Sequence, residues 1–187
     1  NSPHTQFHHL GCQALFSPPA QSDKEAGNFY NRLLWVEGNS VLHLYDKKHT
    51  FTLAGEGKVY TAGTQKLIIA YKGWKICPMV CYDLRFPVWA RNTEGYDLLL
   101  YVANWPKKRV AAWDALLKAR AIENFCYIFA PAQIGKHNKK RETYGHSLII
   151  SPDGKIIKLK KSGTGIIYAN IDPHQSMKLR TIIPSLN

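Results

Sequence analysis

The stretch KICPMVCYDLRFP, Lys75 to Pro87, carries the pattern from which the fold can be worked out. Its apolar first half predicts a strand ending near Cys81. Pro87 suits the start of a short helix running towards Arg91, where a missing N–H costs little. The sequence therefore places a thiol between the end of a strand and the start of a helix.

Two interpretations of Cys81 follow from this position. Backbone N–H groups at a helix start lower the pKa of a nearby thiol and can hold an oxyanion. Asp83 is placed to cap that helix, and Arg85 adds positive charge. Alternatively, Cys81 is a small buried hydrophobe, as free cysteines often are. The spacing of residues alone does not decide between these two interpretations of Cys81. Cys77, four residues earlier and next to Pro78, is expected to pack in the core.

The pattern on both sides of this stretch alternates between strands and helices. The apolar run 97–104 predicts a strand buried on both faces, and 109–124 predicts a helix with one apolar side. Further strands are predicted at 30–36, 41–46, 66–72, 74–81, 126–133, 146–151, 156–160 and 165–172, a polar loop at 135–145, and a last helix at 173–183. This order indicates an α/β fold with a mixed sheet.

Composition limits the classes of protein that fit. The 187 residues are 45% hydrophobic and include four cysteines, which predicts one domain with free thiols. No apolar run approaches the roughly 18 residues of a membrane span. We also find no signal-peptide pattern at the start, so a cytoplasmic protein without membrane contact is expected. The net charge of +12 comes from scattered basic residues that are not interleaved with aromatics, which argues against a nucleic-acid partner and is equally compatible with acidic small substrates.

Several separated segments resemble the nitrilase superfamily of carbon–nitrogen hydrolases. They include YDKKHTF (45–51), AGEG (54–57), VCYDLRFP (80–87) and YVANWP (101–106), in the family's order. Residues 27–128 resemble omega-amidase-like members, and residues 129–187 resemble the deaminated-glutathione amidase group. The resemblance implies an α-β-β-α sandwich. Residues 1–26 form an atypical segment, and the first part of the family domain is expected to be missing.

The resemblance also implies roles for particular residues. Cys81 matches the nucleophile, Lys47 the catalytic lysine, and Glu56 a glutamate that follows the lysine. The N–H of Tyr82 would stabilise the oxyanion. The substrate pocket would include Asn104, Trp105 and Arg85, although Trp105 suits a core position equally well.

The implied reaction is hydrolysis of a small amide, such as an omega-amide of a dicarboxylic acid, through a cysteine thioester. It needs no metal or cofactor, and the resemblance favours a homodimer. One family feature has no match: the triad glutamate belongs upstream of the lysine, and neither Glu25 nor Glu37 lies in the expected motif. A catalytically incomplete homologue that acts by binding or assembly is therefore the alternative.

Overall fold

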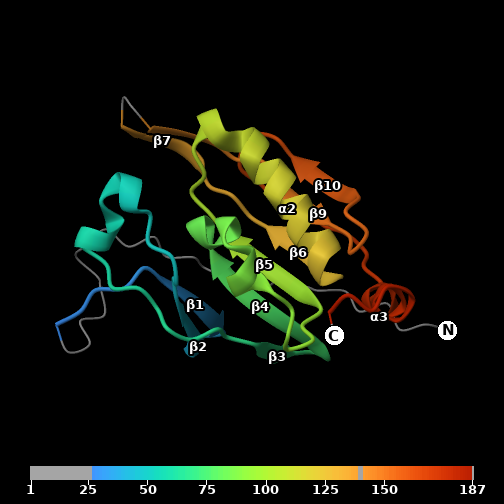
Figure 1. Ribbon diagram of the computed structural model, residues 1–187. Helices are drawn as coiled ribbons and strands as arrows, with labels where there is room; N and C mark the ends of the chain where they lie inside the picture. The colour runs from blue at the N-terminus through green and yellow to red at the C-terminus, as the bar shows by residue number, and fades with distance from the viewer. Residues whose placement is uncertain (1–26, 139–140, 187) are drawn as a thin grey trace.

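A computed structural model describes residues 27–138 and 141–186 of the chain. Its centre is a six-stranded sheet (Figure 1). In spatial order the strands are β10 (Ile156–Lys160), β9 (Ser147–Ile150), β6 (Tyr127–Ala130), β5 (Leu98–Val102), β4 (Trp74–Val80) and β3 (Ile69–Tyr71). The three central strands are parallel, and the others pair antiparallel. The predicted mixed sheet is confirmed.

Alternate residues of the central strands face two different layers. Met79 and Tyr101 point to the side covered by helix α2 (Val110–Asn124), whose Trp113, Leu117 and Ala121 are fully buried there. Ile76 and Leu100 point to the other side and pack with Trp35. Every residue of β5 is buried, as its apolar run predicts, because both faces of this strand are covered.

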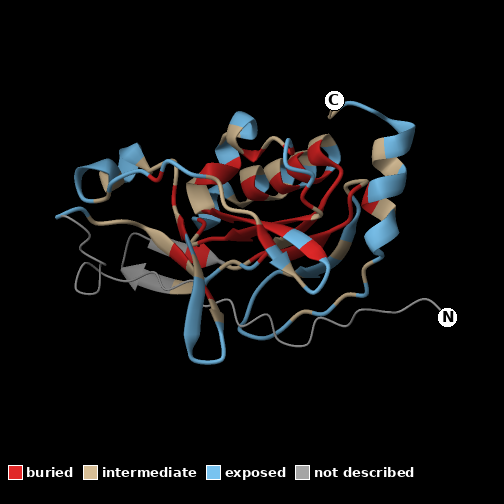
Figure 2. Ribbon diagram, turned by 90° about the horizontal axis from the view of Figure 1, so that it is seen from below, coloured by how far each residue is buried: buried red, intermediate tan, exposed pale blue. Residues whose placement is uncertain are grey.

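The second layer contains the hairpin of β1 (Arg32–Glu37) and β2 (Ser40–Asp46). Leu33 and Tyr45 face the sheet and pack against Val80 and Val102. The outer side of β2 is open, with Val41, Leu42 and Leu44 each about half exposed. Helix α2, the sheet and the hairpin thus form three successive layers of the expected sandwich, with the buried residues concentrated between them (Figure 2).

Pro78 lies inside central strand β4, a position that proline normally avoids. On one side β4 pairs with β5 along the whole run, with Pro78 opposite Leu100. On the other side β3 pairs only with residues 74 to 76. The missing N–H of Pro78 therefore falls beyond the end of β3, where the ladder does not need a donor.

Two predicted segments differ from the structure. Residues 135–145, expected to form a polar loop, largely belong to a second hairpin of β7 (Ile134–Asn138) and β8 (Arg141–Tyr144). Residues 165–172, expected to form a strand, pair with no strand among the described residues. Ile166 and Tyr168 are largely exposed there, so the apolar run predicted a strand that the observed packing does not form.

The last helix is confirmed as α3 (Pro173–Ile182) and lies at the end of the sheet where β5 and β6 begin (Figure 1). The Tyr127 hydroxyl donates to the Gln175 side chain at 2.6 Å, and Arg180 donates to the carbonyl of Phe125 at 3.2 Å. Within the described part of the chain, no helix combines the length and the apolar character needed to cross a membrane.

Candidate active site

Cys81 lies at the carboxyl end of β4, where the chain turns into the 3₁₀ helix η4 (Cys81–Arg85). Its φ of +47° is in the left-handed region, which residues other than glycine rarely adopt. The side chain is half-buried, and its Sγ lies 3.9 Å from the backbone oxygen of Asn104 at the end of β5. A strained turn thus presents the thiol at the sheet edge where ligands of α/β folds gather.

The pKa of the Cys81 thiol is above its ordinary value, contrary to the lowered pKa expected from a helix start. Burial is the largest cause and raises the pKa, while the charge of Lys47 lowers it only in part. The helices that follow explain the difference, because η4 and α1 (Pro87–Ala90) are too short to supply much positive potential. The resting group is a thiol, so nucleophilic attack requires a base.

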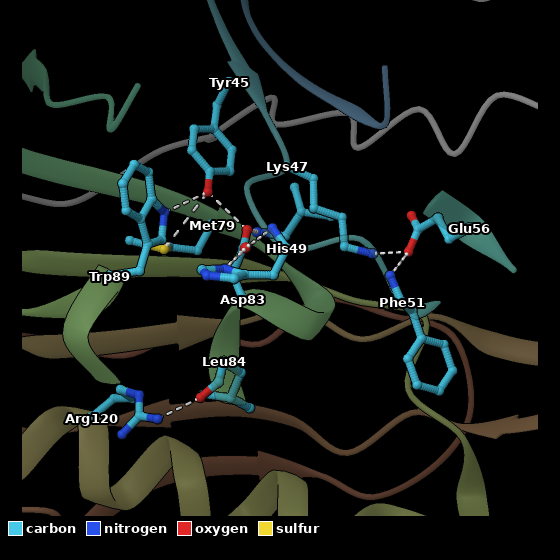
Figure 3. Close-up of polar contacts among 11 residues, drawn as sticks. Tyr45, Lys47, His49, Phe51, Glu56, Met79, Asp83, Leu84, Trp89 and Arg120 are labelled. Carbon is cyan, nitrogen blue, oxygen red and sulfur yellow. Dashed lines mark hydrogen bonds and ion pairs between the residues drawn. The ribbon is translucent and has the colours of Figure 1, made fainter. Parts of the chain in front are cut away.

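Lys47 follows directly after β2 and forms an ion pair with Glu56 (Figure 3). Its Nζ lies 2.6 Å from Glu56 Oε2, and only 4% of the Lys47 side chain is exposed. Oε2 also accepts the Phe51 N–H at 2.5 Å, while Oε1 accepts Asn31 Nδ2 at 2.6 Å. Three donors therefore fix this carboxylate, and the carboxylate fixes the buried ammonium.

These contacts decide the protonation of Glu56. Burial is the largest single influence and raises its pKa, but the charge of Lys47 and the hydrogen bonds together outweigh it. The pKa consequently lies below the ordinary value, and Glu56 is ionised at neutral pH. A carboxylate held in this way is a weak proton acceptor, which suits a group that positions Lys47 better than a general base.

Asp83, in η4, connects the Cys81 turn to the strand that carries Lys47. Its fully buried carboxyl group accepts the Tyr45 hydroxyl at 2.8 Å and the backbone N–H groups of His49 and Val80 at 2.9 and 3.1 Å. His49 Nδ1 lies 2.8 Å from the same group. The expected capping of the helix at Pro87 by Asp83 is wrong, because that helix has Phe86 as its N-cap and no side-chain cap; Asp83 instead accepts the Val80 N–H at the start of η4. The Tyr-x-Lys-x-His spacing has a physical reason, since Tyr45 and His49, two residues before and two after Lys47, both bind Asp83 (Figure 3).

Aromatic rings and two arginines surround this centre. The ring of Phe51 lies 4.9 Å from that of Tyr82. The guanidinium of Arg85 lies over the indole of Trp105 at 5.5 Å, and that of Arg109 over the Phe51 ring at 5.3 Å. Residues from the ends of β4 and β5 and from the loop after β2 therefore meet at one place.

The structure brings most of the predicted site residues together. The N–H of Tyr82 belongs to the first turn of η4, where an amide has no acceptor within the helix. Trp105 is 5% exposed, packs against Trp113 and also carries Arg85 on its ring, so it is part of the core and of the site border. Cys77 is fully buried, as expected, and burial raises its pKa to about 12.

Residues outside the centre have structural contacts. Arg120 pairs with Glu123 at 2.8 Å within α2. The His146 side chain, which comes from the segment before β9, lies 3.1 Å from Asp114 of α2. Asn31 was not predicted, because an asparagine one residue before a strand has no distinguishing pattern. Asn31 and Glu56 are 25 residues apart in the sequence, and the hairpin brings their side chains together.

A metal site is not formed by the residues that the structure describes, since no three of their histidine, cysteine and carboxylate side chains form a suitable cluster.

Comparison with known proteins identifies the family of the chain. The profile of the carbon-nitrogen hydrolase family matches residues 14–181. Omega-amidase YafV of Escherichia coli K12 is 43% identical over 168 residues, which cover 90% of this chain and 61% of that protein. Mouse deaminated glutathione amidase is 32% identical over 181 residues, covering 90% of this chain and 56% of the relative.

The fold comparison gives the same result. The CN-hydrolase superfamily protein XC1258 of Xanthomonas campestris, solved with an arsenic adduct in its active site, superposes with a TM-score of 0.80 at 37% identity. The superposition covers 85% of this chain and 63% of XC1258. The chain spans about three fifths of the length of omega-amidase YafV. The family profile, the relatives and the shared fold show that this chain belongs to the carbon-nitrogen hydrolase family of the nitrilase superfamily.

Proposed function

We propose that this chain carries the nucleophile of an amidase that hydrolyses small amides to carboxylates and ammonia. The observation that supports the proposal most is the buried Lys47–Glu56 pair, whose ammonium acts electrostatically on the thiol of the strained Cys81 turn. This combination offers a nucleophile and a fixed positive charge for the oxyanion, which acyl transfer requires.

The proposed reaction has two stages. A base removes the Cys81 proton, and the sulfur attacks the amide carbon. The carbonyl oxygen becomes an anion, which the Lys47 ammonium and the Tyr82 N–H stabilise. Collapse breaks the C–N bond, the nitrogen leaves as ammonia with the transferred proton, and a thioester remains. Water then attacks the thioester, which yields the carboxylate and restores the thiol.

The substrate class follows from charge at the site and from the relatives. Omega-amidase YafV carries the name of an enzyme for the terminal amide of a dicarboxylic acid. Such a substrate keeps one free carboxylate, and the exposed guanidinium of Arg85 at the site border is a suitable partner for it. We therefore propose an omega-amide of a dicarboxylic acid, bound between Asn104, Trp105 and Arg85.

Ammonia release from succinamate tests the proposal. The parent chain should release ammonia, and a Cys81→Ala variant should not, because the covalent step requires the sulfur. Equal rates for the two chains would show that Cys81 is not the nucleophile. Cys77→Ala serves as the matched control, since that thiol is buried away from the site and should leave the rate unchanged.

The second candidate is a homologue that acts by binding or assembly. The observation that favours it is the raised pKa of Cys81 combined with the lowered pKa of Glu56, because Glu56 is then a poor base for that thiol. Intact mass after incubation with succinamate distinguishes the two. A slowly hydrolysed adduct of the acyl mass on Cys81 means that attack proceeds and deacylation fails, whereas neither adduct nor ammonia favours the binding role.

Two further expectations belong to this proposal. We propose that the chain forms a homodimer, as the resemblance to the family implies, and light scattering at micromolar concentration measures it directly. We also propose that the net charge of +12 serves acidic small substrates rather than nucleic acid. Nucleic-acid affinity that appears at low salt and falls steeply as salt rises would contradict this.

A further inference from the structure

The six arginines whose side chains the structure describes fall into two groups. Those in the first group bond to carboxylates or backbone carbonyls through the guanidinium, and they are Arg32, Arg91, Arg120 and Arg180. The second group consists of Arg85 and Arg109. Within residues 27–138 and 141–186, each of these two contacts an aromatic ring and no carboxylate. Both side chains are exposed.

The two arginines of the second group lie on the same border of the candidate site. Arg85 covers the ring of Trp105, whose neighbour Asn104 provides the backbone oxygen next to the Cys81 sulfur. Arg109 covers the ring of Phe51, whose N–H binds the Glu56 carboxylate. Each guanidinium therefore contacts an aromatic residue that is itself next to the proposed chemistry: Trp105 adjoins Asn104 beside the Cys81 sulfur, and Phe51 binds Glu56.

Trp105 connects the two arginines physically. Its ring lies beneath Arg85, and its Nε1–H donates to the backbone oxygen of Arg109 at 2.8 Å. This bond fixes the end of the 3₁₀ turn η5 (Lys107–Arg109) relative to the Arg85 side chain. Because Trp105 is buried, the backbone of Arg109 has a fixed position relative to the ring that Arg85 covers.

A cation–π contact leaves the N–H donors of a guanidinium group available for other partners. Those donors match the two oxygens of a carboxylate. Arg85 and Arg109 lie 5.5 and 5.3 Å from the centroids of their rings and contact no carboxylate among the described residues, so their donors are available to an acidic ligand.

Helix stability does not explain Arg109. Three consecutive cations, Lys107, Lys108 and Arg109, precede α2, and the first turn of this helix contains no acidic residue. Positive charge at this end opposes the helix dipole. These cations therefore lower the stability of the helix. Binding of a ligand of opposite charge would explain why they are present at this end.

We propose that Arg109 is a specificity-determining residue that binds the free carboxylate of the substrate together with Arg85. The inference rests on the proposed amidase function and extends it: the substrate is acidic at the end remote from the amide, and two guanidinium groups on neighbouring aromatic rings recognise that end. Amides that lack the carboxylate do not use Arg109.

Binding measured without turnover tests this directly. In a Cys81→Ala background, calorimetry gives the Kd of succinamate and of butanamide, which has the same carbon chain without the carboxylate. Arg109→Gln should weaken succinamate binding about 10- to 100-fold, the range for a lost charge-assisted contact, and leave butanamide within about 2-fold. Arg109→Lys should be intermediate, because it keeps the charge and loses the planar donors.

Lys108→Gln is the matched control. It removes the same charge from the neighbouring exposed position, and it should change succinamate binding by less than about 2-fold, as expected for a screened surface charge. Unfolding midpoints of Arg109→Gln and Lys108→Gln should coincide, since each removes one exposed cation from the same end of α2. Equal losses in Arg109→Gln and Lys108→Gln, unchanged binding in Arg109→Gln, or no succinamate binding by the parent would each overturn the role of Arg109.

The outcome also separates this inference from the proposed function. If the chain with Cys81 intact releases no ammonia while succinamate binding still depends on Arg109, the hydrolysis proposal fails and the recognition proposal stands. If ammonia is released and kcat/KM is the same in Arg109→Gln, the recognition proposal fails alone.

Discussion

Replacing Asp83 with alanine should disconnect the strand that carries Lys47 from the turn that carries Cys81. The carboxyl group is fully buried and accepts three hydrogen bonds: from the Tyr45 hydroxyl and from the backbone N–H groups of His49 and Val80. Alanine leaves these donors without their acceptor inside the protein.

The expected cost follows from those contacts. A buried donor left unsatisfied costs about 1 to 3 kcal/mol, so three of them give roughly 3 to 9 kcal/mol. Water entering the space of the lost carboxyl group recovers part of this, which places our estimate near the lower end, at about 3 to 5 kcal/mol. For a chain of this length that is a fall in Tm of roughly 6 to 20 °C.

Urea unfolding followed by tryptophan fluorescence measures the effect, with Asp46→Ala as the matched control. Asp46 pairs with Arg32 at 2.6 Å but is partly exposed, so its loss should cost about 1 kcal/mol or less. A fall in the urea midpoint for Asp83→Ala no larger than that for Asp46→Ala would refute the reasoning. Ammonia release by Asp83→Ala, measured well below its Tm, should also fall, because Lys47 is no longer held beside Cys81.

Three other perturbations have defined outcomes. Glu56→Gln should lower the free energy of unfolding by about 1 to 3 kcal/mol at pH 7, and this difference should disappear as the pH falls below the ordinary value of 4.5 and through the lower folded pKa, because the ionised carboxylate provides the stability. In a Cys12→Ser background, iodoacetamide should label Cys81 about tenfold faster at pH 8 than at pH 7, as expected for a thiol with a raised pKa, and should leave Cys77 unlabelled. Gly63→Ala should destabilise the protein by about 1 to 3 kcal/mol, because the new Cβ would lie 2.1 Å from the backbone oxygen at the end of β2.

Each of these has a contradicting result. A Glu56→Gln difference that persists unchanged at pH 3 would mean that the charge of Glu56 is not its source. Labelling of Cys81 that is independent of pH between 7 and 8 would indicate a thiolate already formed at neutral pH. Gly57→Ala is the control for Gly63→Ala, since its new Cβ meets only a threonine side-chain oxygen at 3.2 Å and should cost less. Equal costs would show that the close approach at Gly63 is not limiting.

The sequence was sufficient to predict the central sheet and its helix, because their apolar patterns are long and regular. The run 97–104 became β5, and Trp113, Leu117 and Ala121 became the buried side of α2. Local pattern was insufficient at residues 135–145, where a hairpin forms from a mostly polar sequence, and at 165–172, where an apolar sequence pairs with no described strand. Strand pairing depends on neighbours that are distant in sequence, so these two segments could not be judged from composition alone.

The candidate site was predictable for a different reason. Cys81, Lys47 and Glu56 were assigned from family motifs, and the structure places Lys47 and Glu56 in direct contact. The electrostatics were not predictable, since the expected lowering of the Cys81 pKa ignored how far the thiol is buried. Asn31 and Arg109 were missed because their importance lies in contacts to Glu56 and Phe51, which are separated from them by many residues along the chain.

The backbone of Cys81 has a consequence for protein engineering. With φ at +47°, this residue has a backbone conformation that glycine adopts without strain, whereas any residue with a side chain loses about 1 kcal/mol or more of folding stability there. A selection that scores only thermal tolerance should therefore enrich glycine at position 81 and discard the sulfur. Directed evolution of this protein for robustness therefore needs a turnover screen at every round, because the substitution that relieves the backbone strain at position 81 also removes the proposed nucleophile.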